Sequence, residues 1–444
     1  MMNKKALIVG WGESGKGSAL LLQKKGYDIF VYDDAQSIDC KPCKDVSKLS
    51  VFEAVADKDL VVISPSICLN HKCVAYAKSC KIEVVGELEL GYKYCHNNIV
   101  AITGTNGKTT TTMLMSNILT NSGFDSRAVG NIGKSFCREL CNIGDGAYIV
   151  LEVSSFQLEG TKTFRPNFAI CLNLSPDHIE RHVTFENYAE VKKRIFANQT
   201  QDDYSILNYD DDVVKNFVDS VSGKCYFFSL KHRVKGVYLR NNEIIFEDEK
   251  REVVCSVDDM WSNFSYNISN AMPCILVAKL LGIDNDTIKL TLKNFKPPKY
   301  RLEHTADIGK RKIFNDSKAT NIDSTLKACG NMQGSTALIV GGYNKGISYE
   351  SFFTMLPSCV RHIVGCGENV YDIMQFMPQN HLYSFEVTTS LERAVELVLQ
   401  KDVDNILFSP TTSSYDRYTS YVQRGEHFDR IINQIANEYP QNQQ

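Results

Sequence analysis

Residues 99–110 read IVAITGTNGKTT, an apolar strand that runs into a glycine-rich turn and then into a threonine-rich helix. Glycines at such a turn let backbone N–H groups approach phosphate oxygens. The start of the helix adds partial positive charge, and Lys108 adds a full one. The strict phosphate-loop spacing puts four residues between the first glycine and the Gly-Lys pair, whereas Gly104 and Gly107 bracket only two. The stretch predicts a nucleotide site with a shortened loop, in which Thr109 offers a hydroxyl to Mg²⁺. A glycine turn beside a solvated lysine is the alternative.

The same order of strand, glycine turn and helix occurs at the start of the chain. An apolar strand leads into GWGESG at residues 10–15, and the next strand ends in an acidic pair. A GxGxxG turn marks a backbone that approaches a diphosphate closely, and an acidic residue about 20 positions later suits a ribose. We expect a diphosphate beside Glu13 and Ser14, and a ribose or base beside Asp33 or Asp34. A turn that only packs a helix is the alternative.

The pattern of strands and helices predicts three α/β domains in the chain of 444 residues. Strands and helices alternate, so the sheets are expected to be parallel. We expect a Rossmann-like domain over 1–95, a central P-loop ATPase-like domain over 96–297 and a second Rossmann-like domain over 298–444. Short alternating strands over Lys224–Phe246 predict a small antiparallel appendage on the central sheet.

Composition limits the classes of function. Lys and Arg total 49 and Asp and Glu 52, a net charge of −3, so we expect no nucleic-acid partner and no membrane partner. No apolar run reaches the roughly 18 residues of a membrane-spanning helix, and the first residues lack the pattern of a signal peptide. We expect a cytoplasmic monomer whose 15 cysteines are reduced core thiols.

Polar side chains follow two strands of the predicted central sheet. Glu152 ends one apolar run, and Asp177 and His178 follow the next. Because ligands gather at the carboxyl ends of parallel strands, we expect Glu152 to hold a metal ion beside the nucleotide. A helix-capping carboxylate is the alternative, and His182 is interpreted as a surface residue.

Lys192 is a charged residue in an apolar stripe. At about 100° per residue it shares one helix face with Phe185, Tyr188, Ile195 and Phe196. A lysine there must snorkel, pair or lose its charge. A neutral lysine can react with carbon dioxide to give a carbamate, an anionic oxygen ligand suited to Mg²⁺. Snorkelling is the alternative.

Four loops of the third predicted domain offer cations or hydroxyls at strand ends. They cover residues 300–303, 315–321, 341–346 and 409–416. Such groups suit a small dicarboxylate and the far side of ATP, so together they predict a site.

Taken together, these motifs resemble the Mur ligase family of peptidoglycan synthesis, and within it the branch that adds D-glutamate. The matching stretches are GTNGKTTT (104–111), LEVSSFQLE (151–159), NLSPDH (173–178), YAEVKKRIF (188–196), YNISNA (266–271), YRLE (300–303), NDSKATN (315–321), GGYNKG (341–346) and SPTTSSYDRY (409–418). They occur in family order along nearly the whole chain. The resemblance implies an ATP-dependent, ADP-forming ligase that joins D-glutamate to UDP-N-acetylmuramoyl-L-alanine through an acyl phosphate. It also implies two Mg²⁺ ions and a carbamylated Lys192.

The resemblance implies roles for individual residues as well. Those for ATP are Gly104, Thr105, Asn106, Gly107, Lys108, Thr109, Thr110, Asn267, Asn270, Arg301 and Asp316. Those for the UDP-muramoyl substrate are Glu13, Ser14, Asp33, Asp34, Ser64, Asn131 and His178. Those for D-glutamate are Lys318, Thr320, Lys345, Ser414, Tyr415 and Tyr421. The catalytic residues are Lys108, Glu152, His178 and Lys192, and the metal ligands are Thr109, Glu152, His178 and Lys192. Departures from the family pattern occur at Ser66, Tyr266 and Tyr421.

Three other functions stay open. An oxidoreductase would use the first glycine turn for NAD(P), but this leaves the second turn, Glu152 and Lys192 unexplained. A nucleotide-binding switch would hydrolyse ATP or GTP without joining anything. A ligase of the same family that adds a different amino acid would share most of these motifs.

Overall fold

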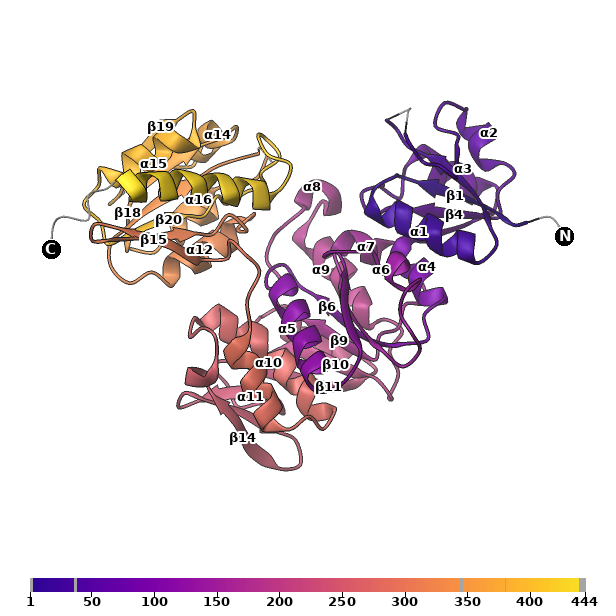
Figure 1. Ribbon diagram of the computed structural model, residues 1–444, viewed down its shortest axis with the longest axis horizontal. Coiled ribbons are helices and arrows are strands. Elements are labelled where there is room, and N and C mark those ends of the chain that lie inside the picture. Colours follow the sequence, from indigo (N-terminus) through magenta and orange to yellow (C-terminus); the bar gives the residue numbers. More distant parts are fainter. Residues whose placement is uncertain (1–2, 36–37, 344–345, 380, 439–444) are drawn as a thin grey trace. The chain divides into compact units, whose positions relative to one another are not determined.

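The computed structural model describes residues 3–35, 38–343, 346–379 and 381–438. The chain forms two compact units, Met1–Lys296 and Pro297–Gln444, and its strands form three sheets (Figure 1). The mixed α/β class with largely parallel sheets confirms the predicted fold class. The domain boundaries at 95/96 and 297/298 stay a prediction.

The first sheet has five parallel strands in the order β3-β2-β1-β4-β5. Its strands are β1 (Lys5–Val9), β2 (Asp28–Tyr32), β3 (Lys44–Asp45), β4 (Leu60–Ile63) and β5 (Glu83–Gly86). Its helices are α1 (Glu13–Lys24), α2 (Val51–Val55), α3 (Lys72–Ser79) and α4 (Glu87–Lys93). The chain order reverses at β1, whose neighbours are β2 and β4, so the glycine turn after β1 lies at the point where ligands of such sheets bind.

The central sheet has nine strands in the order β14-β13-β12-β11-β10-β9-β6-β8-β7. They are β6 (Asn98–Thr103), β7 (Ser126–Gly130), β8 (Tyr148–Glu152), β9 (Phe168–Cys171), β10 (Tyr204–Asn208), β11 (Lys224–Ser229), β12 (Gly236–Arg240), β13 (Glu243–Glu247) and β14 (Arg251–Ser256). The helices are α5 (Lys108–Asn121), α6 (Phe136–Glu139), α7 (Ser155–Glu159), α8 (Ile179–His182), α9 (Phe185–Lys193), α10 (Ser265–Leu280) and α11 (Asn285–Asn294), with 3₁₀ turns at Arg194–Phe196, Val214–Ser220 and Val257–Asp259.

The antiparallel appendage is smaller than the sequence predicts. β11 pairs in parallel with both β10 and β12, and only β12, β13 and β14 are antiparallel. Asn241 and Asn242 have φ of 52° and 66° and make the expected tight turn between β12 and β13. The prediction was wrong for β11. The six residues between β11 and β12 carry the chain back, so β12 runs in the same direction as β11. Gly236 makes that close pairing possible, since a Cβ there would lie 1.9 Å from the carbonyl oxygen of Phe227.

Alternate residues of β6 serve opposite faces of the central sheet, as a strand requires. Val100 and Ile102 pack in the core under α5, α10 and α11, which lie side by side in Figure 1. Ile99 and Ala101 pack in the opposite core with residues of α7 and α9. β6 is therefore buried on both faces, and the loop that follows it has a rigid base.

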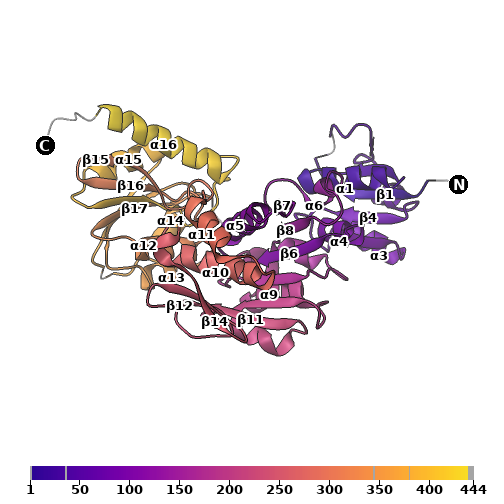
Figure 2. The same ribbon diagram turned by 60° about the horizontal axis from the view of Figure 1, so that its bottom comes forward.

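The second unit has six strands in the order β15-β16-β20-β17-β18-β19, and only β15 and β16 pair antiparallel. The strands are β15 (Glu303–Ile308), β16 (Arg311–Asn315), β17 (Thr336–Val340), β18 (Val360–Cys366), β19 (Ser384–Thr388) and β20 (Asn405–Phe408). The helices are α12 (Ile322–Gly330), α13 (Glu350–Thr354), α14 (Val370–Gln375), α15 (Leu391–Leu399) and α16 (Tyr421–Glu438). The long helix α16 lies along α15 and β15 (Figure 2). Within the described part of either unit, no helix is both long enough and apolar enough to cross a membrane.

Candidate active site around the glycine loop

The loop between β6 and α5 depends on its glycines. Gly104 has a φ of 146° and Gly107 a φ of 89°, conformations that residues with a Cβ rarely adopt. A Cβ at Gly107 would lie 2.1 Å from Oδ1 of Asn270. Asn270 on α10 therefore lies directly against the loop, as expected for a residue of the nucleotide site.

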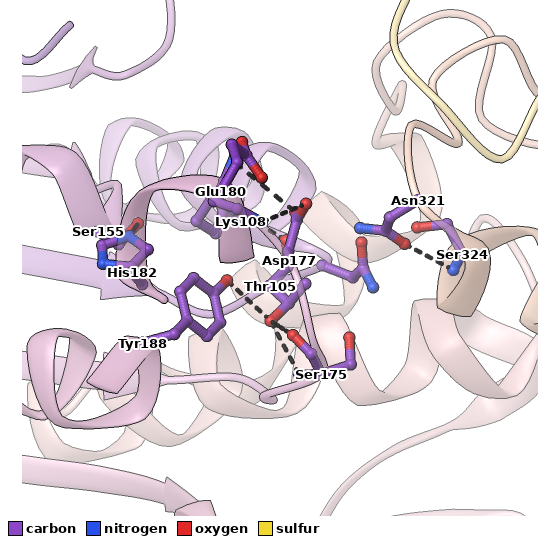
Figure 3. A network of polar contacts seen from close by, with 12 residues as sticks. Thr105, Lys108, Ser155, Ser175, Asp177, Glu180, His182, Tyr188, Asn321 and Ser324 are labelled. Carbon is purple, nitrogen blue, oxygen red and sulfur yellow. Dashed lines mark hydrogen bonds and ion pairs between the residues drawn. The ribbon is translucent and has the colours of Figure 1, made fainter. Parts of the chain in front are cut away.

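Residues that follow β9 hold the loop in place. The backbone N–H of Asn106 donates to Oδ1 of Asn173 (2.9 Å), and Nδ2 of Asn173 donates to the carbonyl of Asn106 (3.0 Å). The hydroxyl of Thr105 donates to the carbonyl of Ser175 (3.1 Å) and lies 3.0 Å from the hydroxyl of Tyr188. Figure 3 shows Thr105, Ser175 and Tyr188 meeting at this point.

Lys108 concentrates positive charge over the loop. Its Nζ donates to the carbonyls of Gly104 and Thr105, each at 2.9 Å. The neighbouring hydroxyl of Thr110 is buried and has no hydrogen-bond partner in the described chain. Thr109 lies beside it in the first turn of α5 and is half-buried. Lysine, loop N–H groups and the helix start together suit the phosphates of a nucleotide.

Glu152 ends β8 with an unused carboxylate oxygen. Its Oε1 accepts a hydrogen bond from Nδ2 of Asn131 (2.9 Å). Its Oε2 is buried without any hydrogen-bond partner among the described residues. A buried carboxylate oxygen without a donor is costly unless a cation meets it, so the geometry fits the expected metal role.

No group of three His, Cys, Asp or Glu side chains in the described ranges could hold a metal ion by itself. A metal at Glu152 would therefore need hydroxyl, phosphate or carbamate oxygens as further ligands. These hard oxygen ligands are the type that Mg²⁺ prefers.

Lys192 is buried in α9, as its place in the apolar stripe predicts, with 2% of its surface exposed. Its Nζ donates to the carbonyl of Gly104 (2.9 Å) and to the hydroxyl of Thr103 (3.3 Å), and lies 5.0 Å from the centre of the Tyr188 ring. Burial, followed by the positive charge of Lys108, lowers the pKa of Lys192 to about 7. A substantial fraction of this amine is therefore neutral at neutral pH and able to react.

His178 and His182 lie in different surroundings. His178 precedes α8 with a φ of 54°, and 37% of its side chain is exposed. His182 is buried, so its interpretation as a surface residue was wrong. Its Nε2 lies 3.0 Å from the hydroxyl of Ser155 (Figure 3), and its Nδ1 lies 3.5 Å from Glu159. The reason is that α8 turns His182 back toward α7, which four residues of sequence pattern do not reveal.

The expected residues of the first sheet surround its glycine turn. The hydroxyl of Ser64 donates to the carbonyl of Gly10 (2.9 Å), and Oδ2 of Asp33 accepts from the backbone N–H of Trp11 (2.8 Å). Both side chains thus brace the turn. Glu13 lies 3.5 Å from Arg138, Asp34 pairs with His71 and Lys72, and Ser14 is half-buried.

In the second unit, Asp316 is the central polar residue. Its Oδ1 accepts from the N–H of Leu302 (3.0 Å) and its Oδ2 from the hydroxyl of Ser409 (2.9 Å). Burial raises the pKa of Asp316 to about 7, although the positive charge of Arg301 opposes the shift. Nε of Arg301 is buried and has no partner within the described chain.

In the expected amino-acid pocket, Lys318 contacts Tyr421 directly. Nζ of Lys318 donates to the hydroxyl of Tyr421 (3.0 Å) and lies 4.3 Å from the centre of its ring. Ser414 is buried, Thr320 is half-buried and Tyr415 is exposed. Lys345 lies outside the described residues.

Asn267, in the first unit, donates to Ser262 (3.0 Å) and has a buried Oδ1 with no partner in the described ranges.

Sequence reasoning missed four residues that shape the site: Thr103, Asn173, Tyr188 and Arg181. The guanidinium of Arg181 pairs with Glu159 at the end of α7. Thr103 and Tyr188 contact Lys192, and Asn173 anchors the loop. Asn173 and Tyr188 stand within the quoted motifs and could have been chosen for that reason. Nothing in the sequence pattern marks Thr103 or Arg181.

Comparison with known proteins identifies the family of the chain. The family model of the Mur ligase middle domain matches residues 102–278. The chain is 35% identical to a UDP-N-acetylmuramoylalanine--D-glutamate ligase of Caldicellulosiruptor bescii, with 98% of each chain covered. It is also 35% identical to the enzyme of the same name from Koribacter versatilis, again with 98% of each covered.

Solved structures show the same fold. A pseudomurein peptide ligase type C from Methanothermus fervidus matches with a TM-score of 0.62 and 19% identity, covering 98% of this chain and 100% of the other. MurF from Acinetobacter baumannii matches with a TM-score of 0.62 and 13% identity, covering 97% and 93%. Since relatives of over 30% identity align along almost its whole length, the chain belongs to the Mur ligase family.

Proposed function

We propose that this protein is an ATP-dependent, ADP-forming ligase that joins D-glutamate to UDP-N-acetylmuramoyl-L-alanine in peptidoglycan precursor synthesis. The observation that carries the proposal is the arrangement around the glycine loop. There the charges of Lys108 and Glu152 both act on the buried amine of Lys192. The name of the activity shared by the relatives supports the choice of substrates.

The chemistry follows from the weakness of a carboxylate as an acylating agent. The γ-phosphoryl group of ATP passes to the L-alanyl carboxylate, which gives an acyl phosphate and ADP. The deprotonated amine of D-glutamate then attacks the acyl carbon, and phosphate leaves. Lys108 and the N–H groups at residues 104–110 stabilise the phosphate charge, and holding the amine close to the acyl carbon is mainly entropic work.

Two Mg²⁺ ions fit the proposal, with Thr109, Glu152, His178 and Lys192 as the protein ligands. The partnerless Oε2 of Glu152 suits the first ion. When bound, the ions offset the negative charge of the phosphates. His178 with a carbamylated Lys192 would supply ligands to the second ion.

The lowered pKa of Lys192 supports a carbamate at this residue. The neutral Nζ attacks carbon dioxide, a C–N bond forms and one proton is released, which leaves an anionic group. A carbamate would replace a buried amine of lowered pKa with two oxygen ligands, and a cation held there would offset its negative charge.

The other assignments belong to the same proposal. Asn267, Asn270, Arg301 and Asp316 contact the nucleotide. The residues that serve the UDP-muramoyl substrate are Glu13, Ser14, Asp33, Asp34, Ser64, Asn131 and His178. Lys318, Thr320, Lys345, Ser414, Tyr415 and Tyr421 serve D-glutamate. The proposal includes three domains with the boundaries predicted above, a cytoplasmic location and a monomer.

The test is phosphate and ADP release from ATP with UDP-N-acetylmuramoyl-L-alanine, with and without D-glutamate. We expect sustained release only when both substrates are present, and none when L-alanine, L-lysine or meso-diaminopimelate replaces D-glutamate. Release without any amino acid would instead identify a nucleotide hydrolase. Release with one of the other amino acids would identify a different ligase of the family.

A further inference from the structure

Arg181 joins three separate segments of the first unit. Its Nε lies 3.1 Å from each carboxylate oxygen of Glu159, and its Nη2 lies 2.5 Å from one of them. Nη1 donates to the carbonyl of Ser66 and Nη2 to the carbonyl of Ile67, both at 3.2 Å. Only 12% of the side chain is exposed. Glu159 ends α7, Arg181 lies in α8, and Ser66 and Ile67 follow β4, so one guanidinium ties the first sheet to both helices of the central site.

Neighbouring side chains reinforce this connection. Nδ1 of His182 lies 3.5 Å from the same Glu159, which therefore holds α8 at two successive residues. The guanidinium of Arg181 lies 4.5 Å from the centre of the Phe156 ring, and that ring packs 4.8 Å from His178. We call Arg181, Glu159, His182 and Phe156 the Arg181 bracket.

The helix that carries Arg181 depends on such contacts. α8 has four residues, too few to be stable alone. It begins after His178 at a φ of 54° and ends before Val183 at a φ of 70°. A β-branched residue at positive φ is strained and persists only where the surroundings hold it. The position of His178 therefore depends on the bracket.

The bracket also forms one wall of a cleft. The cleft is small and open, and it is lined by Ser64 and Ile67 at the end of β4 and by Phe156, Glu159 and Arg181 from the central site, among others. It lies at the carboxyl end of β4, beside the side chain that braces the first glycine turn.

We propose that Arg181 is a positioning residue that sets the distance between the first glycine turn and the loop of His178, for a substrate that must reach both. The inference rests on the proposed function, since that substrate is UDP-N-acetylmuramoyl-L-alanine. The donors of Arg181 are directed at Glu159 and at two backbone carbonyls, so it acts through these segments and not on the reacting atoms. A lysine cannot reproduce the role, because an ammonium lacks the planar fork that serves a carboxylate and two carbonyls at once.

The test compares Arg181→Ala and Arg181→Lys with the wild type in steady-state kinetics for each substrate separately. We expect Arg181→Ala to lower kcat/KM for UDP-N-acetylmuramoyl-L-alanine about 100-fold, since displacement by about 1 Å has effects of this size. The KM for ATP should stay within about twofold, because the glycine loop is braced by Asn173 and Ser175 and not by Arg181. Arg181→Lys should recover only part of the loss, and added guanidinium ion should partly restore Arg181→Ala.

Arg165→Ala is the matched control. Arg165 also pairs with a buried carboxylate, Asp203, at 2.7 Å, but Asp203 and its other partner Thr200 lie outside the bracket and the cleft. It should lose stability with unchanged kinetic constants. If Arg181→Ala is folded and retains the wild-type KM and kcat, or if its KM for ATP rises as much as that for the UDP substrate, Arg181 has no positioning role.

Should Arg181→Ala fail to fold, Glu159→Gln provides the second variant, because it keeps the size of the side chain and removes the charge. The same selective loss, smaller in size, supports the proposal, and unchanged kinetics overturns it. If the wild type itself releases no phosphate with D-glutamate, the proposed function has failed. An active wild type with unaffected variants refutes only the role of Arg181.

Discussion

Lys192 in the first unit and Arg424 in the second are equally buried cations, each with 2% of its surface exposed. Their surroundings differ. Lys192 donates to one carbonyl and one hydroxyl. Arg424 donates to the carbonyls of Ser317, Thr412 and Ser413 and to the hydroxyl of Ser317, at 2.9 to 3.2 Å.

The pKa values follow these surroundings. Burial lowers the pKa of Arg424 only to about 10, so it stays charged at neutral pH, whereas the pKa of Lys192 falls to about 7. Arg424 gathers backbone carbonyls from two loops and acts as a structural cation. Lys192 has few acceptors, and its amine is available for chemistry. The comparison teaches that, at equal burial, the ordinary pKa of the cation and the sign of the neighbouring charge decide whether it stays charged. The negative Asp416 raises the pKa of Arg424, and the positive Lys108 lowers that of Lys192.

The largest expected effect is a loss of turnover when Lys192 is replaced. Under the proposed function, Lys192→Ala should lower kcat about 1,000-fold or more, because a metal held by the carbamate would lose an oxygen ligand, and short carboxylates such as formate should partly restore it. Lys192→Arg is the control, since a guanidinium stays charged and forms no carbamate, and it should be inactive without rescue. Full activity of Lys192→Ala would show that Lys192 is not a reactive residue, and its contrast with the structural Arg424 would fail.

Replacing the structural cation should affect folding. Arg424→Met leaves the carbonyls of Ser317 and Thr412 without a donor among the described residues, whereas that of Ser413 keeps the N–H of Tyr343. The variant should destabilise the protein by about 3 kcal/mol, measured from urea unfolding of the second unit. Arg424→Lys keeps the charge with fewer donors and should fall between the methionine variant and the wild type. If Arg424→Lys were as stable as the wild type, the number of hydrogen bonds that the cation makes would not determine its contribution to stability.

Removing the charge of Lys192 should stabilise the ligand-free protein, whereas removing the charge of Arg424 should destabilise it. Lys192 has a folded-state pKa of about 7, below its ordinary 10.5, so its burial opposes folding fully below pH 7, and this cost fades as the pH rises toward 10.5. Lys192→Met should therefore raise stability by about 2 kcal/mol at pH 7, and the gain should shrink by pH 10. Gly104 keeps its hydrogen bond from Lys108 in this variant. A loss of stability at pH 7 would show that the lysine is structural as well.

The smallest effect concerns a buried acid. Burial raises the pKa of Glu87 to about 7 from 4.5, and its Oε2 has no partner in the described residues, while Oε1 accepts from the N–H of Cys137. The cost of ionising Glu87 therefore appears as the pH rises from 4.5 to 7. Glu87→Gln should stabilise the protein by about 1 kcal/mol at pH 8 and not at pH 4.5, measured by thermal unfolding. The exposed Glu83→Gln is the control, and an equal gain at both pH values would contradict the prediction.

Much of this fold could be predicted from the sequence, because its signals are local. Apolar runs of strand length and glycine turns located the strands, and the stripe around Lys192 located a buried charge. The pairing direction of β11 could not be predicted, since it depends on where a connecting loop leads the chain.

The candidate site was predictable to a lesser extent. The glycine loop and Glu152 have their own local signals. The burial of His182 and the contacts of Arg181 have none, because they join residues near positions 66, 159 and 181 that meet only in the folded protein.

The central sheet is open at both ends, and β14 is one of its edges. Unpaired N–H and carbonyl groups along such an edge can recruit strands from other molecules and begin aggregation. β14 presents the exposed charges Arg251 and Glu252, and its register with β13 shifts between Ile244 and Ile245. An irregular, charged margin is a poor template for an incoming strand, and this disfavours polymerisation through that edge.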